Sequence, residues 1–289
     1  MRPRGPAHVH DRPRDTSGRG PGRGLELRRN VRGRARSGAV RERVEPRHHP
    51  RAAWGRPVKL QGSVAVVTGG GRGIGRAIAL ALAEAGAAVA VAARTAEELD
   101  RVVDEIRAAG GRGLALVADV TKAGEVDELA RATEAALGPP QVLVNDAGIV
   151  VRAPLVETSE EDWDAVMATN VKGAFLCCRS FLPGMIRRMR GRIVNIASIS
   201  GRLGTRQLAA YCASKWALVG LTKALAEEVR EHSIQVNAIA PGSVATDMLQ
   251  AGMPGAGADM TPSDIARVVL FLASDAPDAL TGSVIDVFG

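Results

Sequence analysis

Apolar residues from residue 60 to the end of the chain alternate between two patterns. Short, nearly continuous apolar runs are typical of buried strands, and apolar positions recurring every three or four residues are typical of amphipathic helices. The expected strands cover 63–69, 88–93, 113–120, 141–146, 192–198, 234–242 and 283–287. The expected helices cover 73–87, 95–110, 122–137, about 163–190, 208–232 and 263–274. Gly86 is the expected C-terminal cap of the first helix, and Thr95 the N-terminal cap of the second.

Strands that are apolar on both sides, each followed by a helix, indicate a parallel sheet covered on both faces. We therefore predict a single α/β domain over residues 58–289, with a Rossmann-type doubly wound parallel sheet. A ligand should bind beyond the carboxyl ends of the strands, near the point where the strand order reverses.

Residues 1–57 have a different composition. They contain 16 arginines, no lysine and five acidic residues, a net charge of +11, whereas the remainder carries −4. The basic character therefore belongs to this head, and we expect no nucleic-acid binding by the folded domain. The Arg/Gly/Pro-rich head is expected to be disordered. The head has three interpretations: a nucleic-acid-binding arm, a targeting peptide, or an overextended gene start. We favour the last, with the natural start of the protein near Val58.

Other classes of protein are disfavoured. No apolar run approaches about 20 residues, so no membrane span is expected. The three cysteines form neither a CxxC motif nor zinc-ligand spacing, which favours reduced thiols in the cytoplasm. Four of the five histidines lie in the head, leaving only His232, so we expect neither a Ser-His-Asp triad nor a metal site in the domain.

The segment "TGGGRGIG" (68–75) lies between the first strand and the first helix. Its glycines allow a sharp turn and a close approach to a pyrophosphate, which the following helix N-terminus would bind. A tight turn without a ligand is the alternative. No Gly-Lys-Ser/Thr follows, so a P-loop nucleotidase is disfavoured. The candidate cofactor-binding residues of this loop are Gly69, Arg72, Gly73, Ile74 and Gly75.

The end of the second strand bears on the choice of dinucleotide. NAD sites usually place an acidic residue there, to bind the ribose 2′-hydroxyl. Here the strand ends in Ala93, followed by Arg94, and Arg72 lies in the glycine loop. Two guanidinium groups and no carboxylate favour a 2′-phosphate, hence NADP(H) over NAD(H). The alternative for Arg94 is a solvated loop charge.

The segment "YCASK" (211–215) contains the only tyrosine of the chain. Tyr211 and Lys215 share a helix face at a spacing of four residues. A nearby ammonium stabilises a phenolate, so we expect the pKa of Tyr211 to be lowered enough for it to act as a general acid or base. Ser198, at the end of the fifth strand, could polarise a carbonyl. Alone, a tyrosine and a lysine at this spacing more often lie on an exposed helix face. Together with the glycine loop and Ser198, they favour a catalytic site instead.

Together these segments resemble the short-chain dehydrogenase/reductase family over roughly residues 60–289. The matching segments are "TGGGRGIG", "ADV" (118–120), "NDAG" (145–148), "ATNVKG" (168–173), "VNIASISG" (194–201), "YCASK" and "NAIAPGSVATDM" (237–248).

The resemblance implies hydride transfer between a nicotinamide and a carbonyl or secondary alcohol. It implies the catalytic groups Asn170, Ser198, Tyr211 and Lys215, with Asn170 supporting a water relay through Lys215. It also implies further cofactor contacts at Asp119, Val120, Asn145, Pro241, Gly242, Val244 and Thr246, besides Tyr211 and Lys215. The family needs no metal.

The chain departs from the family pattern in four places. Asp146 replaces the second Asn of Asn-Asn-Ala-Gly, and a carboxylate cannot donate the amide's hydrogen bonds. Only 18 positions separate Thr246 from Asp264, so the substrate lid is short, and the Gly-rich segment 250–260 is a poor helix. The chain ends at Gly289 without the usual acid and two glycines, and the basic head has no counterpart.

Among the branches of the family, the chain most resembles 3-oxoacyl-[acyl-carrier-protein] reductases and related sugar or alcohol dehydrogenases. The arginines within 179–192 could bind an acidic carrier protein, although an ordinary solvated helix end explains them better. The resemblance also implies a homo-oligomer, a dimer or tetramer, paired through the helices expected at 163–190 and 208–232. A different class remains open: a cofactor-binding regulatory or scaffold protein with weak catalysis.

Overall fold

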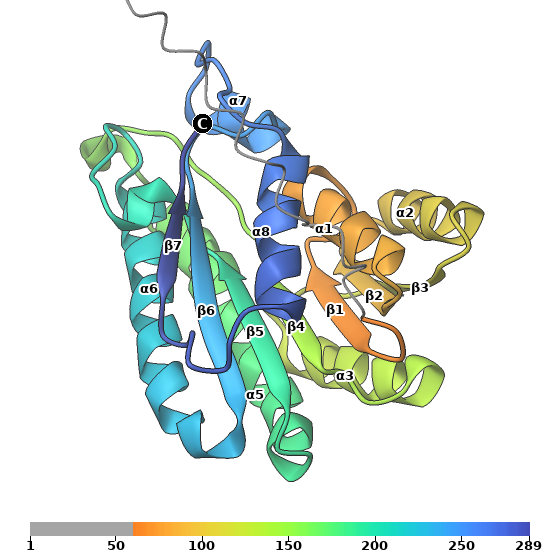
Figure 1. Ribbon diagram of the computed structural model, residues 1–289. Helices are drawn as coiled ribbons and strands as arrows, with labels where there is room; N and C mark the ends of the chain where they lie inside the picture. The colour runs from red at the N-terminus through yellow and green to blue at the C-terminus, as the bar shows by residue number, and fades with distance from the viewer. Residues whose placement is uncertain (1–59) are drawn as a thin grey trace, which may run out of the picture. The chain divides into compact units, whose positions relative to one another are not determined.

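Seven parallel strands form one sheet in the computed structural model, which describes residues 60–289 (Figure 1). The strands are β1 (Val64–Thr68), β2 (Ala88–Ala93), β3 (Arg112–Val117), β4 (Val142–Asn145), β5 (Gly191–Ile196), β6 (Ile234–Pro241) and β7 (Val284–Val287). Their order across the sheet is β3-β2-β1-β4-β5-β6-β7. The order reverses between β1 and β4, which confirms the doubly wound parallel sheet expected from the sequence.

Helices cover both faces of this sheet. One face carries α1 (Gly73–Glu84), α2 (Ala96–Ala108) and α8 (Pro262–Ser274). The opposite face carries α3 (Ala123–Leu137), α5 (Gly173–Arg187) and α6 (Ala209–Glu228). The side chains of β1 show how one strand serves both layers: Ala65 and Val67 pack with α1, whereas Val66 packs with α3 and α5. This alternation in a strand that is apolar up to Thr68 is what a two-sided sheet requires.

The helix ends agree only partly with the expected caps. Gly86 has a φ of 95° directly after Ala85, the C-cap of α1, which confirms it as the left-handed residue that ends the helix. Thr95 occupies the N-cap of α2, but its side chain makes no capping hydrogen bond. The first turn of α2 instead presents Glu97 and Glu98 to the positive end of the helix.

The helical region expected at about 163–190 is not one regular helix. It begins as α4 (Glu160–Met167), widens into a π-helical turn over Ala168–Lys172, and continues as α5. The sequence pattern did not reveal this turn, because a π-helical turn changes the backbone spacing without interrupting the apolar residues. The turn carries Asn170, a candidate catalytic residue, so the irregularity coincides with the site.

Short elements complete the described chain. They are the 3-10 helices Leu155–Glu157, Ile199–Gly201 and Arg230–His232, and the six-residue helix α7 (Asp247–Gly252). No helix within residues 60–289 is long and apolar enough to cross a membrane. The predictions for residues 1–57 lie outside the described residues.

Candidate active site

A cavity of about 540 Å³ opens at the carboxyl ends of the strands, where the strand order reverses. This volume is within the usual range for a small-molecule or cofactor site. Its walls come from the loops after β1, β2, β3, β4, β5 and β6, from the start of α6 and from α7. The ligand site predicted from the order of strands and helices is therefore present as a pocket.

The glycine loop forms one wall of this pocket. Gly69 and Gly73 have φ values of 69° and 54°, in the left-handed region that favours glycine. A Cβ on Gly75 would collide with the carbonyl oxygen of Gly69, so the turn also needs glycine there. Gly69, Arg72, Gly73 and Ile74 line the cavity, while Gly75 lies behind them in the first turn of α1. This loop and helix N-terminus suit a pyrophosphate.

The ends of β2 and β3 form the next part of the wall. Arg94 is exposed and lines the cavity beside Asp119 and Val120. Burial acts to raise the pKa of Asp119, but hydrogen bonds from Thr121 and the charges of Lys122 and Arg94 outweigh it and lower that pKa. Asp119 is therefore held as a carboxylate, oriented by Thr121 and facing Arg94. The end of β2 thus offers an exposed cation at the wall of the cavity.

Ser198, Tyr211 and Lys215 converge on the opposite side of the cavity. The Lys215 Nζ atom lies 5.6 Å from the centre of the Tyr211 ring and donates to the carbonyl oxygen of Ile196 at 2.8 Å. The Ser198 hydroxyl accepts a hydrogen bond from the amide of Ser200 at 3.1 Å, which fixes its direction at the end of β5. A serine, a phenol and an ammonium thus share one pocket.

The acid–base properties of this group differ from the expectation. Burial raises the pKa of Tyr211 to about 12, although a hydrogen bond with Ser198 acts to lower it. The prediction that Lys215 lowers the phenol's pKa is therefore wrong for this structure. The physical reason is that the phenol is desolvated and the ammonium is directed toward the Ile196 carbonyl. Burial also lowers the pKa of Lys215, opposed by the charge of Asp146.

Asn170 does not line the cavity. It is 1% exposed and packs against the loop after β4. Its amide accepts from the Ile149 nitrogen at 2.8 Å and donates to the Ile149 oxygen at 2.9 Å and to Ser214 Oγ at 3.0 Å. These bonds tie the π-helical turn to the pocket wall and to α6. The catalytic role of Asn170 and the water relay implied by the resemblance stay predictions.

The structure also separates Asn145 from the pocket. The predicted ribose contact is 4% exposed, and its side chain points into the core below the cavity. Its Nδ2 donates to Asn195 Oδ1 at 2.8 Å, and Asn195 donates to Thr222 Oγ1 at 2.9 Å. Alternation along β4 thus directs the Asn145 side chain into the core, and its contact with the ribose stays a prediction.

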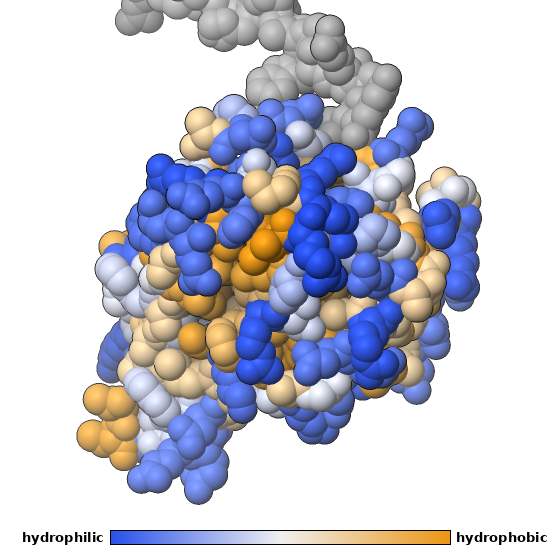
Figure 2. Space-filling view, turned by 90° about the horizontal axis from the view of Figure 1, so that it is seen from below, coloured by the Kyte–Doolittle hydropathy of each residue, from blue (hydrophilic) through white to orange (hydrophobic). Residues whose placement is uncertain are grey.

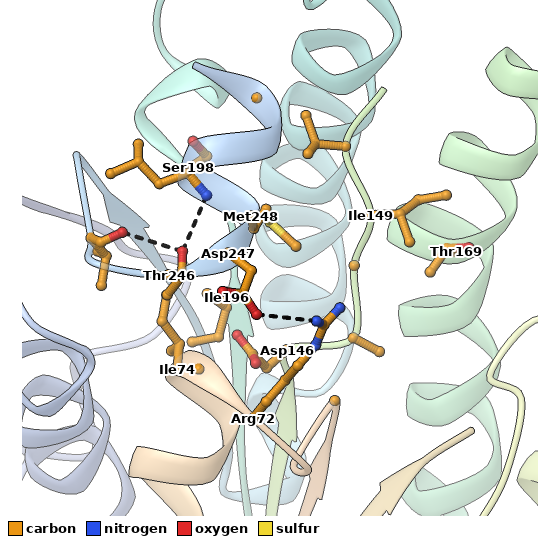
Figure 3. A pocket seen from close by; sticks show the side chains of 18 of the residues that line it. Arg72, Ile74, Asp146, Ile149, Thr169, Ile196, Ser198, Thr246, Asp247 and Met248 are labelled. Carbon is orange, nitrogen blue, oxygen red and sulfur yellow. Dashed lines mark hydrogen bonds and ion pairs between the residues drawn. The ribbon is translucent and has the colours of Figure 1, made fainter. Parts of the chain in front are cut away.

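The segment after β6 closes the cavity. Pro241, Gly242, Val244 and Thr246 line it as predicted, and the Thr246 hydroxyl caps α7 by accepting from the Leu249 amide at 3.2 Å (Figure 3). The short lid begins as α7, which ends at Gly252, and residues 253–260 are not helical, as the Gly-rich sequence of 250–260 predicted for most of that segment. The lid adds three apolar residues to the wall of the cavity that were not predicted from the sequence, namely Met248, Leu249 and Met253.

Two arginines hold this lid. Arg72 contacts the carboxylate of Asp247 at 3.3 Å across the pocket, and both side chains are exposed (Figure 3). Arg152 donates to the carbonyl oxygen of Gly252 at 2.9 Å. Arg72, predicted to bind a 2′-phosphate, thus already has an anionic partner within the site.

Asp146, which replaces an asparagine of the family pattern, is also a charged residue of the pocket. It was not predicted from the sequence as a site residue. It follows β4 and lines the cavity together with Ser198, Tyr211 and Lys215. Burial raises the pKa of its carboxyl, opposed by the charge of Lys215 and a contact with the amide of Gly75. Its position after the strand could have placed it in the site, since the carboxyl ends of adjacent parallel strands meet at one edge.

The proposed carrier-protein patch lies at the other end of the sheet. Arg187–Arg192 precede or begin β5, whereas Ser198 follows it. Arg188 donates to the Pro140 oxygen at 2.8 Å, and Arg192 to the Leu272 and Ala276 oxygens at 3.1 and 2.9 Å. Figure 2 shows this end of the molecule, where hydrophilic side chains surround a smaller apolar area. Arg188 and Arg192 thus anchor the fold, and the position of the patch at the opposite end of the sheet from the pocket does not support it as a docking surface.

Among residues 60–289, no group of three or more His, Cys, Asp or Glu side chains could hold a metal ion. The pocket instead combines a glycine loop, a helix N-terminus, a cationic edge and a Ser-Tyr-Lys group. This combination fits a dinucleotide together with a second, smaller reactant, and defines the class of a nucleotide-dependent oxidoreductase.

Comparison with known proteins agrees with this class. The family model for short chain dehydrogenase matches residues 63–255. The 3-oxoacyl-[acyl-carrier-protein] reductase FabG of Staphylococcus epidermidis is 41% identical over 207 residues, 68% of this chain and 85% of the relative. The same-named protein of Thermotoga maritima is 37% identical over 243 residues, 80% of this chain and 98% of the relative.

A solved structure from Beutenbergia cavernae is also similar. It is described as an NAD(P)-dependent gluconate 5-dehydrogenase with NADP bound at low occupancy. It is 42% identical, covers 80% of this chain and 97% of its own, and superposes with a TM-score of 0.75. The chain therefore belongs to the short-chain dehydrogenase/reductase family and carries the general oxidoreductase function of that family.

Proposed function

We propose that this protein is an NADPH-dependent reductase of a small-molecule ketone, with 3-oxoacyl thioesters as the first substrate class to test. The convergence of Ser198, Tyr211 and Lys215 in one pocket with the glycine loop is the observation that carries the proposal. The FabG relatives favour the 3-oxoacyl class. The Beutenbergia cavernae structure favours a sugar or polyol dehydrogenase as the second candidate.

The roles of the chain's residues follow from their positions. When bound, NADPH supplies the hydride that reduces the carbonyl carbon. The Ser198 hydroxyl binds the carbonyl oxygen, and the Tyr211 O–H bond breaks as that oxygen takes the proton, leaving an alcohol and a phenolate. Lys215 Nζ, fixed by the Ile196 carbonyl, faces the ring and supplies positive charge as the phenolate forms. The high pKa of the phenol keeps the donor protonated at neutral pH.

The function is tested by NADPH consumption, followed by absorbance, with acetoacetyl thioesters, ketoses, diketones and quinones. We expect turnover of at least one class, and a loss of roughly 10²- to 10⁴-fold in kcat for Tyr211→Phe, because the general acid is removed. Consumption that is equal in wild type and Tyr211→Phe for every class would favour the nonenzymatic cofactor-binding alternative instead.

The cofactor preference is proposed from Arg94. Its guanidinium is exposed at the end of β2, lines the cavity and lies near the carboxylate of Asp119. We expect Arg94→Asp to lower kcat/KM for NADPH by roughly ten- to a hundredfold, since charged hydrogen bonds to the phosphate are lost. The value for NADH should change far less. Arg101→Asp, on the exposed side of α2, is the matched charge-reversal control, and equal losses with both cofactors would contradict the assignment.

The proposal also covers the cellular compartment and the oligomeric state of the protein. The three cysteines are unbridged, in keeping with a reducing cytoplasm. Along α5, Leu176, Phe181 and Leu182 are buried in the core, whereas Phe175 is exposed. Trp216 on α6 is exposed as well. We propose a homo-oligomer formed through the α5 and α6 surface.

A further inference from the structure

A second cavity, of about 340 Å³, lies at the amino ends of the strands, at the opposite end of the sheet from the proposed active site. Its walls come from the residues that precede or begin β1, β4, β5 and β6, from the turn after α5, and from the end of α8 and the segment that follows it. The volume is within the usual range for a small-molecule site. None of the residues in these walls has a role in the proposed reduction.

Buried polar side chains line this cavity without partners. Ser63, just before β1, is 7% exposed, and Gln235, near the start of β6, is 6% exposed. Neither side chain makes a hydrogen bond to another group of residues 60–289, although buried polar groups are normally paired. Gln141 adds an amide of fixed orientation: its Oε1 accepts from the Val64 amide at 2.6 Å, so Nε2 remains as a donor. The cavity therefore presents several directed polar groups.

Three arginines bring positive charge to the same walls. Arg188, Arg190 and Arg192 lie between the end of α5 and the start of β5, and all three line the cavity. The bonds of Arg188 and Arg192 to backbone oxygens hold two of the guanidinium groups in place. The Arg190 side chain is exposed and makes no hydrogen bond or ion pair with any other group in the described part of the chain. Its guanidinium is therefore free to bind a ligand.

The acidic groups nearby only partly balance these cations. Asp278 lines the cavity 3.2 Å from Arg192, and its side chain is 82% exposed. Glu134, 3.8 Å from Arg188, lies outside the walls. Three guanidinium groups and one carboxylate leave a charge of 3 − 1 = +2 on the lining residues. A phosphate monoester carries about two negative charges near neutral pH, so the charges match.

We propose that this cavity binds a phosphate group, either as the free ion or as a small phosphate monoester. Guanidinium groups bind phosphate through paired, charge-assisted hydrogen bonds. The Gln141, Gln235 and Ser63 side chains would supply further donors from three neighbouring strands. Donors that approach from several directions favour phosphate over a carboxylate, because phosphate has more acceptor oxygens. The cavity also has room for a small organic group beside the phosphate.

The test is isothermal titration calorimetry of the full chain with inorganic phosphate at constant ionic strength. Because Arg190 anchors no other part of the fold, Arg190→Ala should remain folded and weaken binding by roughly tenfold. Arg187→Ala is the matched control, since Arg187 is an exposed cation on the last turn of α5 that does not line the cavity. It should change the affinity by less than about twofold. Gln235→Glu keeps the shape but adds a negative charge, and should weaken binding more than Arg190→Ala does.

Other ligands define the chemistry of the site. Glycerol 3-phosphate tests the monoester: tighter binding than inorganic phosphate identifies a monoester as the ligand, and weaker binding identifies the free ion. Acetate at the same ionic strength should bind at least about tenfold more weakly than phosphate. Equal binding of acetate and phosphate would contradict a phosphate site.

The location is tested against the proposed cofactor pocket, which also has exposed arginines. Arg94→Asp should leave phosphate binding in place. Binding that is lost in Arg94→Asp but kept in Arg190→Ala overturns the inference, as do equal losses in Arg190→Ala and Arg187→Ala, or no binding by wild type. Circular dichroism checks that each variant is folded. None of these measurements requires turnover, so their outcome is separate from that of the proposed function.

Discussion

A chain of buried side-chain amides and hydroxyls connects the central strands to α6. Asn145 bonds Asn195, Asn195 bonds Thr222, and Thr222 donates to the Leu218 oxygen at 2.8 Å. Both Asn195 and Thr222 are fully buried. Because β5 leads to Ser198 and α6 carries Tyr211 and Lys215, this chain helps to fix the spacing between the proposed catalytic groups.

The bond from Asn195 to Thr222 can be tested by one substitution. Thr222→Val keeps the shape but leaves the Asn195 amide without its acceptor, so we expect a loss of about 1–3 kcal/mol in the free energy of unfolding, measured by urea denaturation. Thr133→Val is the matched control, because Thr133 is equally buried and its hydroxyl likewise bonds the oxygen four residues earlier, at Leu129. Equal losses in the two variants would show that the Asn195 bond contributes nothing.

At the scale of elements, Arg72 in the glycine loop contacts Asp247 at the start of α7. Both side chains are exposed, so the pair contributes little to stability. Its effect should appear in cofactor binding instead, because in the proposed NADPH complex Asp247 would compete with the 2′-phosphate for Arg72. We expect Asp247→Asn to lower KM for NADPH by up to about fivefold. KM for NADH, measured in the same variant, should stay nearly constant; equal changes for both cofactors would contradict the role given to Arg72.

The elements also show what the sequence could and could not predict. Short, largely apolar runs predicted all seven strands, because most of their side chains pack against the helices on one face of the sheet or the other. The π-helical turn at Asn170 and the helix α7 were missed. The turn keeps its apolar residues, and α7 is a six-residue helix with its Thr246 cap and the Arg152–Gly252 bond at its two ends, features that no apolar pattern reveals.

The same reasoning applies to the site. Motif positions at strand ends, such as Arg94, Asp119 and Ser198, were predicted to line the pocket and do, since parallel strands bring their carboxyl ends together. The side-chain directions of Asn145 and Asn170 were not predictable from motifs, because each depends on local backbone geometry. The pKa of Tyr211 was predicted in the wrong direction because a four-residue spacing gives proximity to Lys215 and says nothing of desolvation.

At the scale of the molecule, the aromatic side chains left exposed on α5 and α6 bear on assembly. Phe175 is 44% exposed and lies under Arg179, whose guanidinium carbon is 5.4 Å from the ring centre, and Trp216 is 52% exposed. Aromatic residues and arginine are enriched at the centres of protein interfaces. Both helices cover the same face of the sheet, so one interface could bury all three side chains (Figure 1).

We therefore expect wild type to sediment as a dimer or tetramer, and Trp216→Glu to shift it toward a smaller species, because the substitution would bury an unpaired charge in the interface. Val156→Glu, at a site 93% exposed outside α5 and α6, is the control and should leave the sedimentation coefficient unchanged. Phe271→Glu tests the helices on the opposite face of the sheet, because Phe271 lies on α8 and is 40% exposed. If Phe271→Glu dissociates the protein and Trp216→Glu does not, the interface is formed by α8 rather than by α5 and α6. A monomeric wild type would contradict the proposed oligomer.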